Sequence, residues 1–442
     1  MTTKILFLDP QKKADYRISK DTSGGYGTGN NFGYSLVPKL LKSLCKKYSD
    51  WPPVYLAYCF SVLKELDYEV SFSQKLPDEK EIFDYYIVTS SIVCCETELE
   101  TIRILKNKNK KVFVIGPFAT SISQPYIDAG ATVILGEPEF YFLQKPNLQE
   151  DSNKDKISFN HNYTLDDLPY PRWDKVTKNL GNVNKLFGNF RSVPILATRG
   201  CPYSCRRYCV YPLQQGTKVR QRSVEKIVDE MEFWKNKYGI KMFIFRDPVF
   251  SINKKHTIDF CQELINRKLK IKFVIETHLR ILDSELILTL VKAGLKGVKV
   301  GVESAETEVL KQESRFTVSQ DEQLSKIREL EKFKIMVSAM FIVGFPSDTD
   351  KTIKKTIEYA KHLNTSYAQF SIWTPYPGTP VFLDYKDKII EKRYEKFTQY
   401  ELVYKHLLFN KKEIRKYLND AYSNYYSRFS WLFKFTKGYV GL

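Results

Sequence analysis

The sequence contains no long apolar run. No segment approaches the ~18 consecutive apolar residues that a membrane-spanning helix requires. At the start, the apolar run in MTTKILFLDP ends at Asp9, which is too short for the core of a secretion signal. We therefore expect a cytoplasmic protein, whose thiols stay reduced and can bind iron.

Cysteine is scarce, with 8 among 442 residues, and this content argues against a scaffold held by disulfides. Most of the cysteines lie scattered in apolar segments, where they read as small buried side chains: Cys45, Cys59, Cys94, Cys95 and Cys261.

Acidic residues are outnumbered by basic ones, 51 against 69, which gives a formal net charge of +18. Lysine-rich surfaces attract phosphate groups. The charge is spread along the chain and not gathered into one basic arm, so we expect a solvated surface and no nucleic-acid site. An RNA-modifying enzyme stays an alternative because of the charge.

The remaining cysteines, Cys201, Cys205 and Cys209, are packed into the run TRGCPYSCRRYCVYP. Thiolates so close together on a polar turn can face one point, which indicates a metal or iron–sulfur site. A structural zinc site normally has four protein ligands, and a cubane cluster has four irons to bind. Three cysteines without a fourth nearby leave one coordination position open for chemistry. The alternative is a non-catalytic zinc protein, which would need a fourth protein ligand.

Strand-like and helix-like patterns alternate over residues 1–143. This rotation predicts an α/β domain with a doubly wound parallel sheet of Rossmann type. Ligands of such sheets bind beyond the carboxyl ends of the strands. These ends carry Thr89, Ser90, Ser91, Gly116, Thr120, Gly136 and Glu137.

Residues 144–192 are polar and aperiodic, which predicts a linker. The rotation resumes over residues 193–385 and predicts a partial (βα)6 barrel of TIM type, with its site at the carboxyl ends of the strands. Those ends carry the three cysteines, Arg246, Asp247, Glu276, His278, Glu303, Ser304, Gly344 and Pro346. For single residues such as Ser304 and Asp348, helix capping is the alternative.

Residues 386–442 are basic and aromatic. Apolar residues at helical spacing from Ile414 to Tyr425 predict a helix that packs against the barrel mouth. The closing SRFSWLFKF interleaves aromatic and basic residues, as segments at membrane surfaces do. Peripheral contact with the inner face of a membrane, or with a lipid-like substrate, is therefore a second interpretation.

Taken in order, the motifs resemble the radical S-adenosylmethionine (SAM) superfamily, and within it the proteins with an N-terminal cobalamin (B12)-binding-type domain. Between Pro194 and Asp384 the motifs are RGCPYSCRRYCVYP, FRDPVF, IETHLR, AGLKGVKVGVESA, MFIVGFPSDT and TPYPGTP. Between Lys4 and Leu143 they are WPPVYLAYCFSVLKELDYEV, VIGPFAT and GEPE.

The resemblance implies that the three cysteines hold a [4Fe–4S] cluster and that SAM binds its open iron. One electron from the cluster would cleave SAM to methionine and a 5′-deoxyadenosyl radical, inside a barrel that excludes water. The residues implied in SAM binding are Tyr208 beside the adenine, Glu303 and Ser304 near the ribose, Gly344 where the backbone approaches the nucleoside, and also Asp247, Glu276 and Pro346.

The chain departs from the family pattern at two places. The usual spacing between the cysteines is three residues and then two, whereas Cys205 and Cys209 enclose Arg206, Arg207 and Tyr208. The second departure concerns cobalamin, because the chain has no histidine before His161 to bind cobalt in an Asp-x-His-x-x-Gly motif. Either cobalamin binds without a protein imidazole, at the strand-end loops from Thr89 to Glu137, or the first domain serves as a lid or scaffold.

The resemblance further implies an enzyme that modifies an unactivated carbon of a small or lipid-like metabolite. Methylation is the commonest outcome for this pairing of domains, and ring formation or rearrangement would use the same parts. A flavodoxin or ferredoxin would supply the electron. The alternatives are a cobalamin-independent radical SAM enzyme with a degenerate first domain and an RNA-modifying radical SAM enzyme. Inside the barrel, His278, Arg280 and Trp373 are candidates for substrate contact.

Overall fold

The computed structural model describes residues 2–46, 51–78, 80–177, 180, 183–184 and 190–440. Its N-terminal part contains a parallel sheet in the order β4-β1-β5-β6-β7-β8, so the predicted doubly wound α/β architecture is confirmed. The order reverses between β1 and β5, which makes this the switch point where such sheets usually bind ligands. The strands are β1 (Lys4–Leu8), β4 (Glu69–Ser73), β5 (Tyr85–Thr89), β6 (Lys111–Ile115), β7 (Thr132–Ile134) and β8 (Lys156–Ile157).

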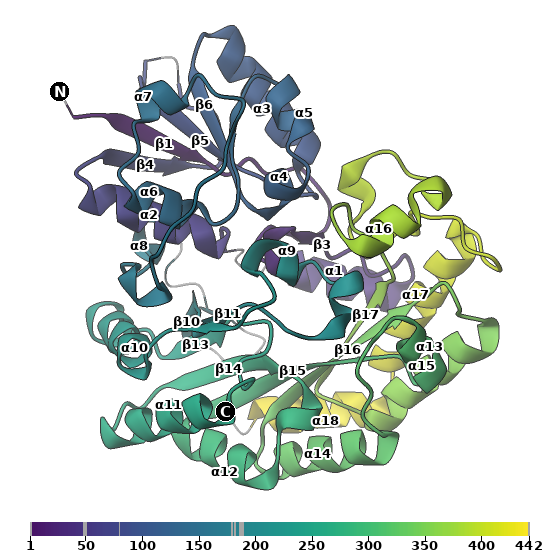
Figure 1. The fold of residues 1–442 in the computed structure, drawn as a ribbon. Helices are drawn as coiled ribbons and strands as arrows, with labels where there is room; N and C mark the ends of the chain where they lie inside the picture. The colour runs from purple at the N-terminus through teal and green to yellow at the C-terminus, as the bar shows by residue number, and fades with distance from the viewer. Residues whose placement is uncertain are drawn as a thin grey trace.

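Helices cover both faces of this sheet (Figure 1). On one face α2 (Val54–Glu65) packs against α6 (Pro138–Leu143), and on the other face α3 (Cys95–Asn107) packs against α5 (Gln124–Asp128). Residues 55–63 of α2 are all buried, which agrees with its almost continuous apolar sequence.

The first sheet extends beyond the boundary predicted at residue 143. The short helix α7 (Leu148–Asp151) follows, and β8 then pairs with β7 as an edge strand. A two-residue strand carries no periodic signal, which is why this segment read as a linker. Further on, α8 (Trp173–Val176) packs against α2.

The C-terminal part contains a second sheet, in the order β17-β16-β15-β14-β13-β10-β9, in which only β9 runs antiparallel. The six parallel strands form the predicted partial barrel, with helices on its outer side (Figure 1). The strands are β9 (Val183–Asn184), β10 (Phe190–Ile195), β13 (Met242–Phe245), β14 (Lys272–Thr277), β15 (Leu295–Glu303), β16 (Met336–Val343) and β17 (Tyr367–Ile372). The outer helices are α10 (Val224–Tyr238), α11 (Lys254–Asn266), α12 (Ser284–Ala293), α14 (Gln320–Lys332) and α15 (Asp350–Leu363).

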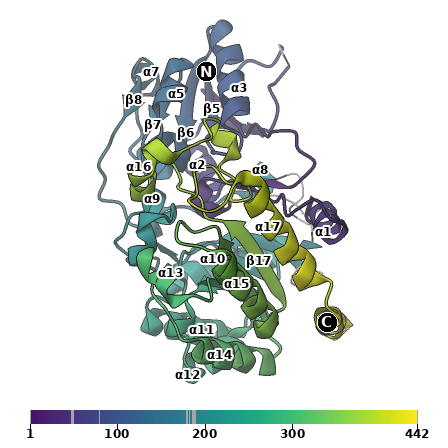
Figure 2. The ribbon, with the colours of Figure 1, turned by 90° about the vertical axis from the view of Figure 1, so that its right-hand side faces the viewer.

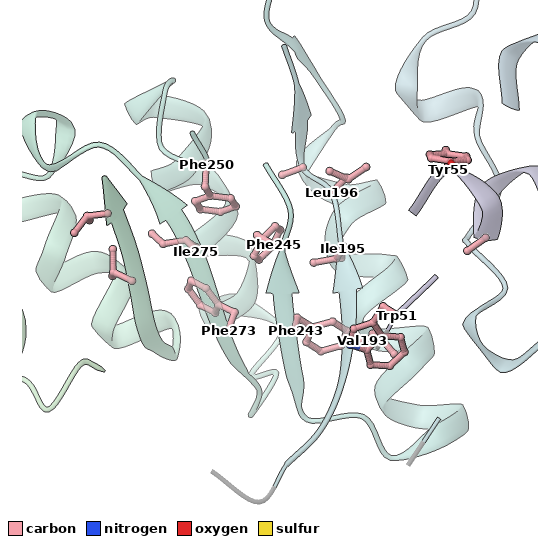
Figure 3. Packing of buried hydrophobic residues seen from close by; sticks show 14 of the residues in the cluster. Trp51, Tyr55, Val193, Ile195, Leu196, Phe243, Phe245, Phe250, Phe273 and Ile275 are labelled. Atoms are coloured by element: carbon pink, nitrogen blue, oxygen red, sulfur yellow. The ribbon is translucent and has the colours of Figure 1, made fainter. Parts of the chain in front are cut away.

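The outer face of the half-barrel carries the main core. Along β16 every second residue is buried, which is the alternation of a strand with one covered face. Figure 3 shows Phe243, Phe245 and Phe273 packed together on the neighbouring strands. The same core continues to Trp51 and Tyr55 of the N-terminal part, so the two sheets share one hydrophobic core.

The helix predicted near the C-terminus is α17 (Lys411–Tyr426), which lies along the edge strand β17 (Figure 2). The hydroxyl of Tyr422 donates to the carbonyl of Phe370 at 2.8 Å and accepts from its N–H at 3.0 Å. Tyr426 makes the same pair of contacts with Ala368. The helix α18 (Phe429–Val440) follows. Within the described ranges, no helix is long and apolar enough to cross a membrane.

Candidate active site

The cysteine loop begins where β10 ends. A two-residue strand, β11 (Thr198–Arg199), leads into Gly200, whose φ of +92° lies in the left-handed region. A Cβ at Gly200 would lie 2.1 Å from the carbonyl oxygen of Lys218, so only glycine fits this turn. The N–H of Cys201 then donates to the carbonyl of Gly216 at 3.2 Å, which fixes the start of the loop.

The extra residue between Cys205 and Cys209 is accommodated in a 3-10 turn, η3 (Ser204–Arg207). The N–H groups of Tyr208 and Cys209 both donate to the carbonyl of Cys205, at 3.2 and 3.1 Å. Cys201 and Cys205 are buried, and Cys209 is half-buried. Burial raises the pKa of the Cys209 thiol, and the nearby Cys205 and Cys201 raise it further. The three thiols therefore lie close enough to influence one another.

Among the described residues, no three His, Cys, Asp or Glu side chains are already arranged at metal-binding spacing, the three cysteines included. The test of fit is therefore the chemistry of the donor set. Three thiols on one turn supply three of the four ligands of a cubane cluster, and no fourth protein donor joins them in the described part of the chain. The donor set fits a [4Fe–4S] cluster with one open iron.

Arg315 provides positive charge beside the cysteine loop. Its Nη1 lies 3.6 Å from the Sγ of Cys205, and its Nη2 lies 3.4 Å from Oε1 of Glu303. A guanidinium beside a thiol favours the thiolate, which is the form that binds metal. The hydroxyl of Tyr208 is buried there and has no hydrogen-bond partner within the described chain. An unpartnered buried hydroxyl is the kind of group that a bound polar ligand would satisfy.

Asp247, predicted to bind SAM, holds the backbone that leads into the cysteine loop. It is fully buried, and its carboxylate accepts hydrogen bonds from the N–H groups of Ala197 and Thr198 and, at 2.7 Å, from the Thr198 hydroxyl. Burial raises the pKa of Asp247 to about 6. The structure therefore shows it positioning residues 197–198.

The other predicted SAM residues lie on successive strand ends. Glu303 ends β15 at a bulge, where its φ of +67° is left-handed, and burial raises its pKa. Ser304 lies 3.2 Å from the hydroxyl of Thr356 and accepts from the N–H of Glu306. Glu306 is the N-cap of the short helix α13 (Thr307–Gln312), and Thr349 is the N-cap of α15, so neither Ser304 nor Asp348 caps a helix.

Gly344 and Glu276 occupy different surroundings. Gly344 has a φ of +74°, and a Cβ there would lie 3.3 Å from Ile414 of α17, so this turn packs closely on the C-terminal helix. Pro346 follows it and is part-exposed. Glu276 lies on β14, and burial raises its pKa. The predicted set thus spans the strand ends of the half-barrel.

The predicted cobalamin-binding hydroxyls after β5 are engaged within the first domain. Thr89 donates to Asp9 at 2.6 Å, and Ser91 donates to Glu98 at 2.8 Å. Ser90 accepts from the N–H of Ala119 at 3.0 Å, and all three residues are fully buried. The buried ammonium group of Lys20 joins this network through Asp9 and Glu98. The switch point is therefore filled by the domain's own side chains.

The loops after β6 and β7 are linked to each other through Thr120. Its hydroxyl donates to the carbonyl of Gly116 and accepts from the N–H of Gly136, both at 3.0 Å.

Glu137 connects the first domain to the cysteine loop. It pairs with Arg199 at 2.5 Å and with Arg220 at 2.7 Å, and these guanidinium groups lower its pKa although burial alone would raise it. Arg199 also pairs with Glu139 at 2.5 Å. Since Arg199 is two residues before Cys201, the GEPE motif anchors the strand that carries the cluster loop.

A small cavity of about 30 Å³ lies between the two sheets. Both halves of the chain line it, including Gly25, Tyr55 and Glu137 from the first and Tyr211 and Arg246 from the second. Of the residues predicted to bind cobalamin, Glu137 lines this cavity.

Sequence reasoning missed several charged residues of this region, among them Asp21, Lys299 and Arg315. Asp21 and Arg315 lie outside all the motifs named above. Lys299 did leave a signal, because it interrupts the apolar strand GVKVGV. Of the candidates for substrate contact, His278 is buried beside Tyr203, and Trp373 donates to Glu313 at 3.2 Å.

The chain is similar to known proteins in sequence and in fold. Residues 195–360 match the model of the radical SAM superfamily. An uncharacterized methyltransferase of Pyrococcus horikoshii is 28% identical over 85% of this chain and 88% of its own length. The anaerobic magnesium-protoporphyrin IX monomethyl ester cyclase of Cereibacter sphaeroides is 32% identical over 54% of this chain and 38% of its own.

Two solved structures share the fold. The radical SAM methyltransferase TsrM from Kitasatospora setae, solved with cobalamin and a [4Fe–4S] cluster, superimposes with a TM-score of 0.64 at 16% identity. The match covers 88% of this chain and 75% of TsrM. The cobalamin-dependent radical SAM enzyme OxsB gives a TM-score of 0.59 at 15% identity, over 81% of this chain and 52% of its own.

Proposed function

We propose that the chain, whose residues 195–360 match the radical SAM superfamily, is a radical SAM enzyme that modifies a small or lipid-like molecule, with methylation as the reaction. The observation that carries the proposal is the loop of Cys201, Cys205 and Cys209 at the mouth of six parallel strands. Arg315 and the unpartnered hydroxyl of Tyr208 lie beside it. The two methyltransferase relatives in sequence and structure support the choice of methylation.

The three cysteines would bind a [4Fe–4S] cluster, which supplies one-electron cleavage of SAM to methionine and a 5′-deoxyadenosyl radical. Residues of this chain would position the cluster loop and the nucleoside of SAM. Asp247 fixes the backbone ahead of the loop, and Arg315 offsets the charge of the thiolate at Cys205. Tyr208 and Glu303 would orient the nucleoside of SAM, and the barrel wall would exclude water from the radical.

Cobalamin is the second cofactor that we propose. Because Thr89 and Ser91 are hydrogen-bonded within the first domain, the corrin would lie at the junction of the two sheets, beside Glu137 and Tyr55, where it would need more room than the small cavity there gives. When bound, it would carry the methyl group. The alternative is a first domain that only anchors the cluster loop. Protein reconstituted with hydroxocobalamin should keep its corrin absorbance after desalting. Loss of that absorbance would favour a first domain that only anchors the cluster loop.

The central test uses protein purified without oxygen and reconstituted with iron and sulfide. Dithionite and SAM should release 5′-deoxyadenosine, and a reduced flavodoxin or ferredoxin should replace dithionite. The variant Cys205→Ala should abolish release, whereas Cys261→Ala, which changes a buried cysteine of α11, should retain it. A colourless protein that binds zinc stoichiometrically and releases no 5′-deoxyadenosine would overturn the proposal.

We also propose peripheral contact with membranes through α18. Phe429 and Phe433 are 89% and 62% exposed, and basic residues flank them in the sequence. Replacing both with serine should reduce sedimentation with anionic lipid vesicles. Equal sedimentation of the two proteins would remove the membrane interpretation.

A further inference from the structure

A lysine lies in the middle of a barrel strand, on the side that faces the interior. Lys299 on β15 is paired in register with Glu276 on β14 and Ser338 on β16. Its neighbours Val298 and Val300 are fully buried in the outer core. Because successive side chains of a strand point to opposite faces, Lys299 faces the concave side of the half-barrel.

The charges around Lys299 come from both halves of the chain. Burial lowers the pKa of Lys299 to about 8, Arg246 and Arg17 lower it as well, and Glu276 and Asp21 act in the opposite direction. Asp21 is already in an ion pair with Arg246, because its Oδ2 lies 2.5 Å from Nη2 of Arg246. Glu276 is the remaining acidic neighbour among these groups, so the positive charges are not balanced locally.

Two cationic side chains at this place each have a donor without an acceptor. Within the described residues, the ammonium group of Lys299 has neither a hydrogen bond nor an ion pair, and the Nε of Arg246 is buried without a partner. Lys299 is half-buried, and a buried donor without an acceptor, such as the Nε of Arg246, is costly. Arg246 also lines the cavity between the sheets, so a ligand there could reach it.

We propose that Lys299 and Arg246 bind an anionic group of the substrate, a carboxylate or a phosphate. Such a group would accept from both cations and complete the pairing that the protein leaves open. That the ligand is a substrate rests on the proposed function. That it is an anion rests on the strand register, the unpartnered Nε of Arg246 and the charges around Lys299. It narrows the substrate class from small or lipid-like molecules to those that carry an acidic group.

The carboxylate of SAM is the competing ligand, and position separates the two. Arg315 lies beside Cys205 and Glu303, at the end of β15 near the cluster loop. Arg315 also donates to the carbonyl of Gly301 at 3.1 Å, two residues from Lys299 on the same strand, whereas Arg246 lines the cavity between the sheets. Arg315 is therefore placed for SAM beside the cluster loop, and Arg246 places its pair with Lys299 toward a second molecule.

The experiment measures anion binding to the full chain after cluster reconstitution. Inorganic phosphate and acetate are titrated separately by calorimetry, so that the two arms distinguish a phosphate from a carboxylate site. We expect saturable binding of one or both probes, weakened about tenfold or more in Lys299→Gln because one charge-assisted contact is lost. Lys299→Arg should restore binding. Lys296→Gln removes a lysine on the same strand that has only Lys272 and Lys334 as charged neighbours, and it should bind like the unaltered chain.

Three outcomes would overturn the assignment: no saturable binding of either probe, equal binding by Lys299→Gln and Lys296→Gln, or a loss in Lys299→Gln that Lys299→Arg fails to restore. A fourth is displacement of the probes by SAM together with weaker SAM binding in Lys299→Gln, which would make the lysine a cofactor contact. Release of 5′-deoxyadenosine by the unaltered chain is measured separately. If that release fails while phosphate or acetate binding depends on Lys299, the proposed function falls and the anion site stands.

Discussion

At the scale of single residues, Lys20 shows how the first domain uses its charges. Its Nζ lies 2.7 Å from Glu98 and 3.1 Å from Asp9, and all three side chains are inaccessible to solvent. Burial alone would lower the pKa of Lys20, but Asp9 and Glu98 raise it above its usual value. Tyr126 donates a further hydrogen bond to Glu98 at 2.7 Å. The network is closed, and it occupies the switch point between β1 and β5.

Removing Lys20 should therefore destabilise the chain strongly. Lys20→Met would leave Asp9 and Glu98 buried without their cation, and breaking a buried ion pair in this way costs about 3–5 kcal/mol. The measurement is the free energy of unfolding from urea titration. Lys39→Met, at an exposed position of α1 (Leu36–Lys46), is the control and should change it by less than about 0.5 kcal/mol. A loss below about 1 kcal/mol in Lys20→Met would contradict this account.

Asp247 makes stability depend on pH. The pKa of Asp247 is raised from 3.8 to about 6, so the folded chain binds this proton more tightly than the unfolded chain does. Its contribution is fully present below pH 3.8 and is lost as the pH rises through about 6. Over that window the unaltered chain should lose up to about 3 kcal/mol relative to Asp247→Asn. Unfolding titrations of both chains at a series of pH values would measure the difference. Parallel pH profiles would refute it.

What the sequence reveals about single residues depends on where their partners lie. Cys201, Cys205 and Cys209 could be recognised because they are neighbours along the chain, so spacing alone brings them together. Lys299 and Arg246 could not be paired in this way, because Lys299 lies on β15 and Arg246 follows β13. Their relation depends on strand register and on which face each side chain takes, and only the folded sheet fixes those.

At the scale of elements, α17 replaces a missing neighbour of β17. An edge strand exposes N–H and C=O groups that invite pairing with another chain. The hydroxyls of Tyr422 and Tyr426 satisfy these groups on Phe370 and Ala368. The helical spacing from Ile414 to Tyr425 was sufficient to predict α17. The hydroxyl contacts were not predictable, because a tyrosine at a helical core position is usually there for its ring.

The variant Tyr422→Phe tests this covering. It keeps the ring but leaves the N–H and C=O of Phe370 without partners, which should cost about 1–3 kcal/mol of unfolding free energy. Tyr417→Phe is the matched control on the same helix, where the hydroxyl bonds to the exposed Asp350. It should cost less than about 1 kcal/mol. Thermal and urea unfolding would compare the two, and equal losses would show that the contacts to β17 contribute nothing special.

At the scale of the whole molecule, the order of strands and helices was predictable and the joint between the sheets was not. Both sheets follow from long periodic segments of the sequence. The joint is made by Arg199, which belongs to the cysteine motif by sequence yet lies against Glu137, Glu139 and Tyr58 of the first domain. Nothing local in the sequence indicates that these charges are partners, since about sixty residues separate them. The structure therefore shows that Glu137 joins the two sheets through Arg199, which the sequence could not show.

This joint makes a prediction about the cluster. Arg199→Met would leave Glu139 buried without its cation, and the cost should again be about 3–5 kcal/mol of unfolding free energy. Because Arg199 lies two residues before Cys201, the cysteine loop should also lose its anchor, and iron content after reconstitution should fall with stability. Calorimetry and iron analysis would measure the two effects. Arg172→Met, which removes a part-exposed pair with Asp174, is the control and should cost less than about 1 kcal/mol with full iron loading. If Arg199→Met melted and bound iron like this control, the first domain would not be holding the cluster loop in place.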